Sequence, residues 1–150
     1  TGDGIRTPKN FSVLTGTDLS ELVDAAGGLK EKIAKAISGG PMMGFAMYTT
    51  DTPITKTSSS ILCMSKDEVS ACEPTACINC GRCVDACPSR IIPSRLADFA
   101  ERHDEEAFLK FNGLECVECG SCSYVCPAKR QLKQAIGSMR KTALANKKKK

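Results

Sequence analysis

The sequence predicts an α+β protein with a β-grasp-like module in residues 1–65 and a helical, cysteine-rich domain in residues 66–128, followed by a helix and a basic tail in residues 129–150. Three observations lead to this prediction. One cysteine spacing occurs twice in the second half of the chain. The first third follows a strand, helix and strand order with glycine turns, and apolar residues at helical spacing follow each cysteine motif.

The predicted β-grasp-like module contains two strands and one helix. Phe11–Leu14 alternates as a half-buried strand does, and Ser60–Met64 is a second short apolar segment of strand type. Between them a helix is expected to begin at Asp18 and to end at Gly27-Gly28. Thr1–Gly4 already has the composition of a turn, so we expect the first strand of this module to precede residue 1.

Closely spaced glycines occur in Gly39–Gly44. Such a segment forms a turn after a strand, or it presents backbone N–H groups to a phosphate or a flavin. Because the segment lacks the G-x-G-x-x-G and Walker contexts, the turn is the favoured interpretation and the ligand site is the alternative.

The second half of the chain repeats the pattern C-x2-C-x2-C-x3-C-P. The first copy contains Cys77, Cys80, Cys83 and Cys87, and the second contains Cys116, Cys119, Cys122 and Cys126. This is the bacterial ferredoxin pattern, which holds [4Fe–4S] clusters through thiolates, and in two-cluster proteins the fourth cysteine of each copy ligates the other cluster. The predicted ligand sets are therefore Cys77, Cys80, Cys83 and Cys126 for one cluster, and Cys116, Cys119, Cys122 and Cys87 for the other.

Other features of the two motifs agree with clusters. Gly81 and Gly120 hold matching places and let backbone N–H groups come close to sulfide. Two oxidised clusters with their thiolates add about −4 formally. The net charge of +4 is then no argument for nucleic-acid binding.

Two alternative readings of the cysteines are less favoured. A structural zinc site usually joins two C-x2-C pairs across a longer gap, often with a histidine ligand, and a disulfide framework requires an oxidising compartment. Cys63 and Cys72 lie outside both motifs. We expect them to be packing or spare thiols, with a replacement ligand or a third metal site as the alternative.

The insert between the motifs and the C-terminus are expected to be helical. Apolar residues from Leu96 to Phe111 fall on one stripe, which predicts a helix or a helical pair that begins at Pro93. His103 lies on that stripe and is expected to be a partly buried packing residue, with tuning of a cluster as the alternative. This pattern favours an α-helical ferredoxin domain.

A second amphipathic helix is expected after Pro127. Its apolar side comprises Leu132, Ala135, Ile136, Met139 and Ala143. Residues 127–150 carry nine basic and no acidic side chains. Lys147–Lys150 is expected to be a disordered, solvated end, and contact with anionic lipid or an acidic partner is the alternative.

The order of these segments resembles a known family. TGDGI, NFSVLTGTDLSELVDAAGG, ISGGPMMGFAM, CINCGRCVDACPSR and CVECGSCSYVCPAKR together resemble the C-terminal portion of the C subunit of the Rnf (Rsx) ion-translocating electron transport complex. The resemblance covers nearly the whole chain. The GGPMMG segment, joined to a two-cluster domain, narrows the resemblance to this one component of the complex.

The resemblance implies a soluble-ligand-binding β-grasp domain and two [4Fe–4S] clusters. It implies a peripheral position on the cytoplasmic side of the inner (plasma) membrane, with other Rnf subunits and ferredoxin-like or flavin redox partners, and no nucleic acid. FMN and NADH are implied only for an N-terminal domain whose sequence is absent here. No catalytic residue is therefore expected in this chain, which is not expected to be catalytic alone.

The predicted function is that of an iron–sulfur electron-transfer subunit, which passes single electrons through two clusters in a complex coupled to Na+ or H+ translocation. One alternative is the iron–sulfur subunit of a heterodisulfide-reductase-like or succinate-dehydrogenase-like enzyme, which the β-grasp-like module disfavours. The other is a scaffold whose clusters only stabilise the fold.

Overall fold

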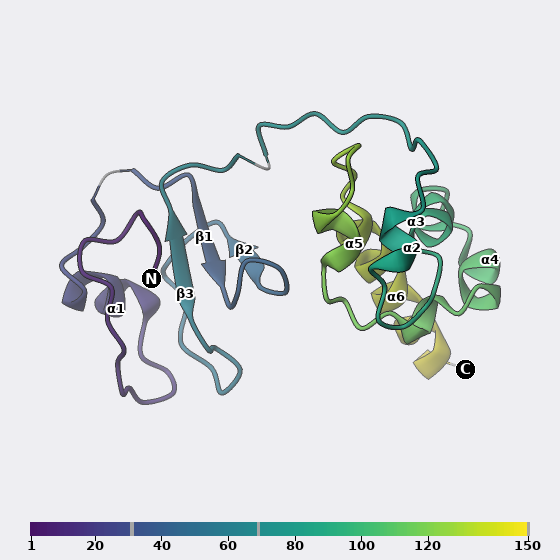
Figure 1. Cartoon of the computed structure of the whole chain (residues 1–150). Helices are drawn as coiled ribbons and strands as arrows, with labels where there is room; N and C mark the ends of the chain where they lie inside the picture. The colour runs from purple at the N-terminus through teal and green to yellow at the C-terminus, as the bar shows by residue number, and fades with distance from the viewer. Residues whose placement is uncertain (31, 69, 150) are drawn as a thin grey trace. The chain divides into compact units, whose positions relative to one another are not determined.

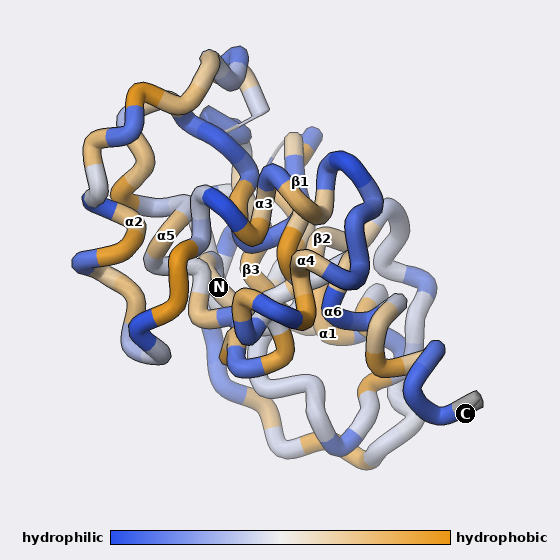
Figure 2. Tube along the Cα trace, turned by 90° about the vertical axis from the view of Figure 1, so that its right-hand side faces the viewer, coloured by the Kyte–Doolittle hydropathy of each residue, from blue (hydrophilic) through white to orange (hydrophobic). Residues whose placement is uncertain are grey.

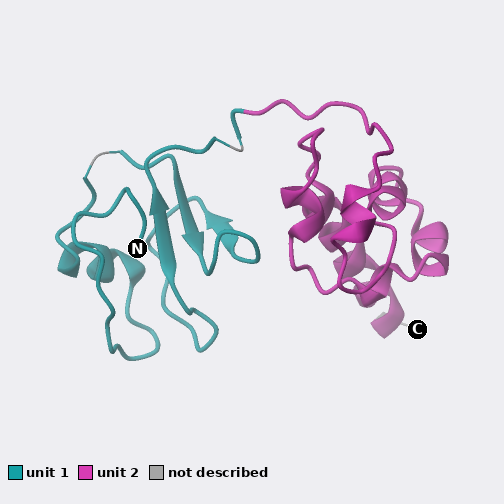
Figure 3. Ribbon diagram, in the orientation of Figure 1, with its two compact units in different colours: residues 1–71 teal, residues 72–150 magenta. Residues whose placement is uncertain are grey.

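The computed structural model of the chain describes residues 1–30, 32–68 and 70–149. It divides into two compact units, residues 1–71 (unit 1) and residues 72–150 (unit 2), as Figure 3 shows. Unit 1 combines a three-stranded sheet with a helix, whereas the described elements of unit 2 are all helical (Figure 1). The predicted α+β fold class is confirmed.

The helix of unit 1, α1 (Leu19–Ala25), lies where the sequence predicts it. Its end is fixed by two glycines with φ values of 84° at Gly27 and 78° at Gly28. The Gly28 N–H donates to the Val23 carbonyl at 2.9 Å, which is the characteristic hydrogen bond of a Schellman motif. Leu19 and Val23 are buried, so the helix is held by its apolar face.

The sheet of unit 1 is antiparallel and has the order β2-β1-β3. Its strands are β1 (Lys35–Ser38), β2 (Phe45–Met47) and β3 (Ile61–Met64). In the register, Ala36 of β1 lies opposite Met47 on one side and Cys63 on the other. The central strand is the most buried of the three, and β3 falls within the segment predicted as a strand.

The strand predicted at Phe11–Leu14 is wrong. These residues have no regular structure and are exposed, and the exposed fraction of Leu14 reaches 83%. An alternating pattern forms a strand only when a neighbouring strand accepts its backbone hydrogen bonds. Among the described residues, Phe11–Leu14 pairs with no strand.

Gly39–Gly44 forms the turn that joins β1 to β2, which is the favoured interpretation of its glycines. Gly39 has a φ of 97°, and the Gly44 N–H donates to the Gly40 carbonyl at 2.8 Å. A Cβ on Gly44 would lie 2.5 Å from the Gly40 oxygen and 2.6 Å from the Ser38 oxygen. Close approach of two backbone segments therefore requires glycine at this position.

Unit 2 is a small helical domain. Its elements are α2 (Arg82–Asp85), α3 (Pro93–Glu101), α4 (Glu105–Lys110), the 3-10 helix η1 (Gly113–Glu115), α5 (Ser121–Tyr124) and α6 (Leu132–Lys149). Helix α3 packs on α6, and α2 contacts α5. Leu96, Phe108 and Ile136, from α3, α4 and α6, are completely buried at the centre of the core.

The helical stripe of the insert is a helical pair, and His103 lies in its turn. His103 adopts a φ of 57°, a left-handed conformation that ends α3. The Asp104 carboxylate then accepts a hydrogen bond from the Ala107 N–H at 3.0 Å and caps α4. His103 is exposed, so its expected role as a packing residue is wrong.

Helix α6 confirms the predicted C-terminal helix, because Leu132, Ile136, Met139 and Ala143 are all buried. The helix runs to Lys149 with a hydrophilic end (Figure 2), so the expected disorder of the basic tail is wrong for residues 147–149, while residue 150 lies outside the described residues. None of the helices that the structure describes combines the length and the apolar character required to cross a membrane.

Replacing Gly44 with Ala should destabilise the hairpin of β1 and β2 by about 1–3 kcal/mol, because the added Cβ overlaps backbone atoms. Hydrogen exchange of the β1 and β2 amides should become faster. Gly40→Ala is the matched control in the same turn, since no described atom lies within 4 Å of its added Cβ. Unchanged exchange in Gly44→Ala would contradict the close approach described above.

Candidate metal centres

The eight motif cysteines line two cavities in unit 2. The first cavity is lined by Cys77, Cys80, Cys83 and Cys126. The second cavity is lined by Cys87, Cys116, Cys119 and Cys122. Each cavity therefore receives three cysteines from one motif and the last cysteine of the other, which is the grouping expected from the spacing.

Unit 2 is an internal repeat whose halves are 39 positions apart, as Cys77 and Cys116 illustrate. In this repeat α2 corresponds to α5, and α3 corresponds to α6. Corresponding helices contact each other, because α2 lies against α5 and α3 against α6. This pairing of the halves brings the last cysteine of each motif to the cavity of the other.

Left-handed backbone conformations shape the two cysteine loops. Asn79 and Glu118, at equivalent positions of the repeat, both have a φ of 54°, and Gly81 and Gly120 have φ values of 79° and 84°. No described atom lies within 4 Å of a Cβ built on Gly81, so a side chain would have room at this position. Glycine is favoured there because of the left-handed backbone conformation. The loops therefore turn tightly enough for three cysteines of one motif to line one cavity.

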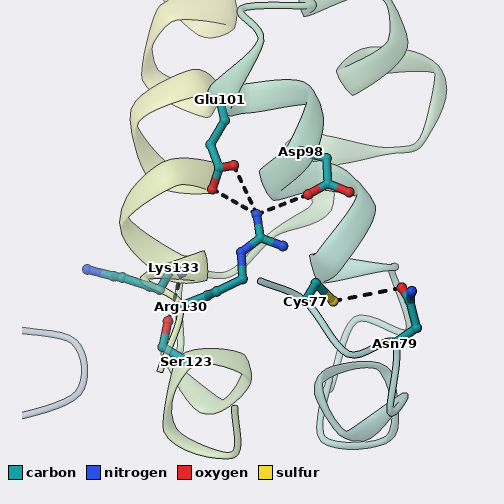
Figure 4. Close-up of polar contacts among 7 residues, drawn as sticks. All are labelled: Cys77, Asn79, Asp98, Glu101, Ser123, Arg130 and Lys133. Carbon is teal, nitrogen blue, oxygen red and sulfur yellow. Dashed lines mark hydrogen bonds and ion pairs between the residues drawn. The ribbon is translucent and has the colours of Figure 1, made fainter. Parts of the chain in front are cut away.

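The first cavity is also lined by Arg130, which is held by two carboxylates of α3 (Figure 4). Its Nη2 atom donates to Asp98 Oδ1 at 3.0 Å and to Glu101 Oε1 at 2.9 Å. Burial alone would lower the pKa of Arg130, but the hydrogen bonds to Glu101 and Asp98 outweigh it and raise that pKa above its ordinary value. Arg130 therefore places a permanent positive charge at this cavity.

The second cavity carries charges of both signs. Glu118 and Lys133 line it, and Arg140 Nη1 lies 3.3 Å from Glu118 Oε1. The Lys133 backbone N–H donates to Ser123 Oγ at 2.9 Å, which ties the start of α6 to α5 (Figure 4). At the position equivalent to Arg130, this cavity has the buried side chain of Ile91.

The motif thiols differ in the direction in which their surroundings shift the pKa. Burial raises the pKa of Cys122 to about 11 and also raises the pKa of Cys116. The Ser121 hydroxyl, 3.5 Å from the Cys119 sulfur, lowers the pKa of Cys119. Cys77 and Cys80 are exposed. Because metal ligation requires thiolates, binding at Cys122 has to displace a firmly held proton.

The donor sets fit [4Fe–4S] clusters, each of which requires four thiolates. Within the described residues, no three His, Cys, Asp or Glu side chains are arranged to hold a single metal ion. The four cysteines of each set line one cavity, which brings four sulfur donors to one site.

Cys63 and Cys72 line neither of these two cavities. Cys63 lies in β3 of unit 1, where burial raises the pKa of its thiol, and Cys72 is exposed at the start of unit 2. Sequence reasoning missed Arg130 as a residue of the first cavity. A comparison of the two motif copies beyond their prolines would have found it, because Arg130 occupies the position of Ile91.

Two domain families match the chain, the 4Fe-4S dicluster domain over residues 76–130 and the SLBB domain over residues 1–46. The chain is 40% identical to the C subunit of the Na(+)-translocating ferredoxin:NAD(+) oxidoreductase complex of Acetobacterium woodii, over 99% of this chain and 34% of that protein. It is 49% identical to the C subunit of the proton-translocating ferredoxin:NAD(+) oxidoreductase complex of Clostridium ljungdahlii, over 90% of this chain and 30% of that protein.

A third relative is the C subunit of the ion-translocating oxidoreductase complex of Methanosarcina acetivorans, which is 42% identical over 88% of this chain and 30% of that protein. The chain thus spans about a third of the length of these relatives. The resemblance drawn from the sequence is confirmed: residues 76–130 belong to the 4Fe-4S dicluster domain family, residues 1–46 belong to the SLBB domain family, and the chain is homologous to a portion of the C subunit of ion-translocating oxidoreductase complexes.

Proposed function

We propose that unit 2 holds two [4Fe–4S] clusters and passes single electrons between them. The observation that carries the proposal is the division of eight cysteines between two cavities, four to each. The proposed ligands are Cys77, Cys80, Cys83 and Cys126 for the first cavity, and Cys116, Cys119, Cys122 and Cys87 for the second. When bound, such clusters supply reversible one-electron chemistry.

The residues of unit 2 would hold the clusters at fixed positions and limit the access of water. The α3–α6 core, with Leu96 and Ile136 completely buried, fixes the spacing of the two cavities. The cysteines of the second cavity are the less exposed, because Cys122 is buried whereas Cys77 and Cys80 of the first cavity are exposed. Hydrogen bonds and charges near each cavity would then set the potential of its cluster.

In its cellular context we infer a relay within an Rnf-type complex, because the relatives belong to ferredoxin:NAD(+) oxidoreductase complexes. Within that proposal, the relay lies at the cytoplasmic side of the membrane, as the family resemblance implies. The other subunits of that complex and a ferredoxin-like or flavin carrier would be its redox partners. Hydride chemistry would belong to other parts of the complex, because the proposed ligands here supply single-electron sites alone.

Anaerobic reconstitution should load about eight iron and eight sulfide per chain, as two cubane clusters require. Chemical analysis of iron and acid-labile sulfide measures this directly, and EPR of the reduced protein should show two interacting spins. Stoichiometric zinc without acid-labile sulfide would refute the cluster proposal.

Double variants test the exchange of the fourth cysteine. Cys126→Ser with Cys80→Ser should be no worse than either single change, because both residues line the first cavity. Cys126→Ser with Cys119→Ser should remove both clusters, because Cys119 lines the second. Iron content and EPR are the readouts. The opposite pattern would mean that each motif binds its own cluster with all four of its cysteines.

The two cysteines outside the motifs serve as matched controls. Cys63→Ser and Cys72→Ser should leave iron content and EPR unchanged, because neither residue lines the first or the second cavity. Cys63→Ser should lower the stability of unit 1, since it buries a hydroxyl where Cys63 is only 1% exposed. Loss of one cluster's iron in either variant would show that the ligand set is incomplete.

A further inference from the structure

The repeat in unit 2 provides an internal comparison of the two cavities, whose lining residues correspond across 39 positions. At two equivalent positions the second cavity has a charged residue where the first has an uncharged one. These two residues, Glu118 and Lys133, have charges of opposite sign. The remaining change of charge is Arg130 in the first cavity against Ile91 in the second. The same backbone site thus carries a permanent charge in one half and an apolar side chain in the other.

We propose that Arg130 raises the reduction potential of the cluster in the first cavity, so that this cluster accepts the first electron. The inference rests on the proposed function of unit 2. Arg130 is not a ligand in this proposal. It acts through its charge, which makes the reduction potentials of the two clusters unequal.

The charge of Arg130 is well placed to have this effect. A cluster becomes more negative on reduction, so a nearby positive charge stabilises the reduced state and raises the potential. The Arg130 side chain is only 11% exposed, so water screens it poorly. In Figure 4 the guanidinium lies between Cys77 and the two carboxylates of α3, and Cys77 lines the same cavity.

Some N–H donors of the Arg130 guanidinium are also not used in hydrogen bonds to described residues. All of its hydrogen bonds to described residues come from Nη2, which binds Asp98 and Glu101. Nε and Nη1 donate to none of the described residues. A guanidinium has five N–H donors, and hydrogen bonds to cluster sulfurs raise the potential in the same direction as the charge.

The opposing carboxylates weaken this effect without cancelling it. Asp98 and Glu101 do not line the first cavity, and their side chains are 35% and 56% exposed. Charges with that exposure are screened by solvent far more than Arg130 is. Among the described residues that line the first cavity, the one charged side chain is therefore the positively charged Arg130.

The charges that line the second cavity, on Glu118 and Lys133, are opposite in sign and balance each other. Arg140, which does not line this cavity, pairs with Glu118 at 3.3 Å. Solvent access adds to the difference, because Cys77 of the first cavity is exposed whereas Cys122 of the second is buried. Exposure favours the more highly charged, reduced state, so it also raises the first potential.

An EPR-monitored redox titration of the reconstituted chain tests the proposal. Wild-type protein should show two unequal midpoint potentials. Arg130→Ile, which copies the residue of the other half, should lower the higher potential and narrow the gap. We expect the higher midpoint potential to fall by on the order of 59 mV. For a one-electron couple this is a tenfold change in the equilibrium constant for electron transfer between the clusters. Arg130→Lys keeps the charge and should narrow the gap less.

Asp98→Asn separates an electrostatic role from a structural one. It removes an ion-pair partner but leaves Arg130 in place, so the higher potential should stay or rise, opposite to Arg130→Ile. If both variants lower it, the ion pair only maintains the fold and the inference fails. It also fails if the wild-type potentials are equal or if the gap widens in Arg130→Ile. Chains that load no iron and sulfide would instead refute the proposed function itself.

Discussion

The structure of unit 2 depends on the packing of its two halves against each other. Helix α3 lies on α6, and Leu96, Phe108 and Ile136 fill the space between the helices without exposure. The chain contains no Trp and only 5% aromatic residues, so this core is small. Because each cavity takes its fourth cysteine from the opposite half, the same packing that buries the core also completes both donor sets. Metal ligation would then add to the stability that a small core lacks.

The cysteine spacing predicted which cysteines the structure brings together, because the information in that spacing is local. Three cysteines within seven positions need only a tight loop, and the left-handed residues at 79, 81, 118 and 120 provide it. The assignment of Cys126 and Cys87 to opposite cavities came from the known pattern of two-cluster proteins rather than from the chain's own periodicity. Arg130 escaped notice because its significance depends on Asp98 and Glu101, about thirty positions away in sequence and brought near by α3–α6 packing.

Two of the mistakes share one cause. The strand expected at Phe11–Leu14 and the packing role expected of His103 both rest on patterns of a few residues, and such patterns indicate a structure only if a partner surface exists. No described strand pairs with Phe11–Leu14, and the stripe is interrupted where His103 adopts a positive φ. Strand β2 was missed for the opposite reason: Phe45 and Ala46 are exposed and show no pattern of burial, and only pairing with β1 defines the strand.

The contrast between Arg130 and Ile91 shows that the ion pairs of unit 2 are not required by its backbone. Burying a guanidinium costs desolvation free energy unless carboxylates offset it, and Asp98 and Glu101 do so from α3. At the equivalent site, the second half closes its cavity with a buried apolar side chain and no ion pair. Packing alone is thus satisfied by the simpler solution. Arg130 lines the first cavity and is held there by two carboxylates. Its presence is better explained by an effect on the cluster proposed for that cavity than by a contribution to the stability of the fold.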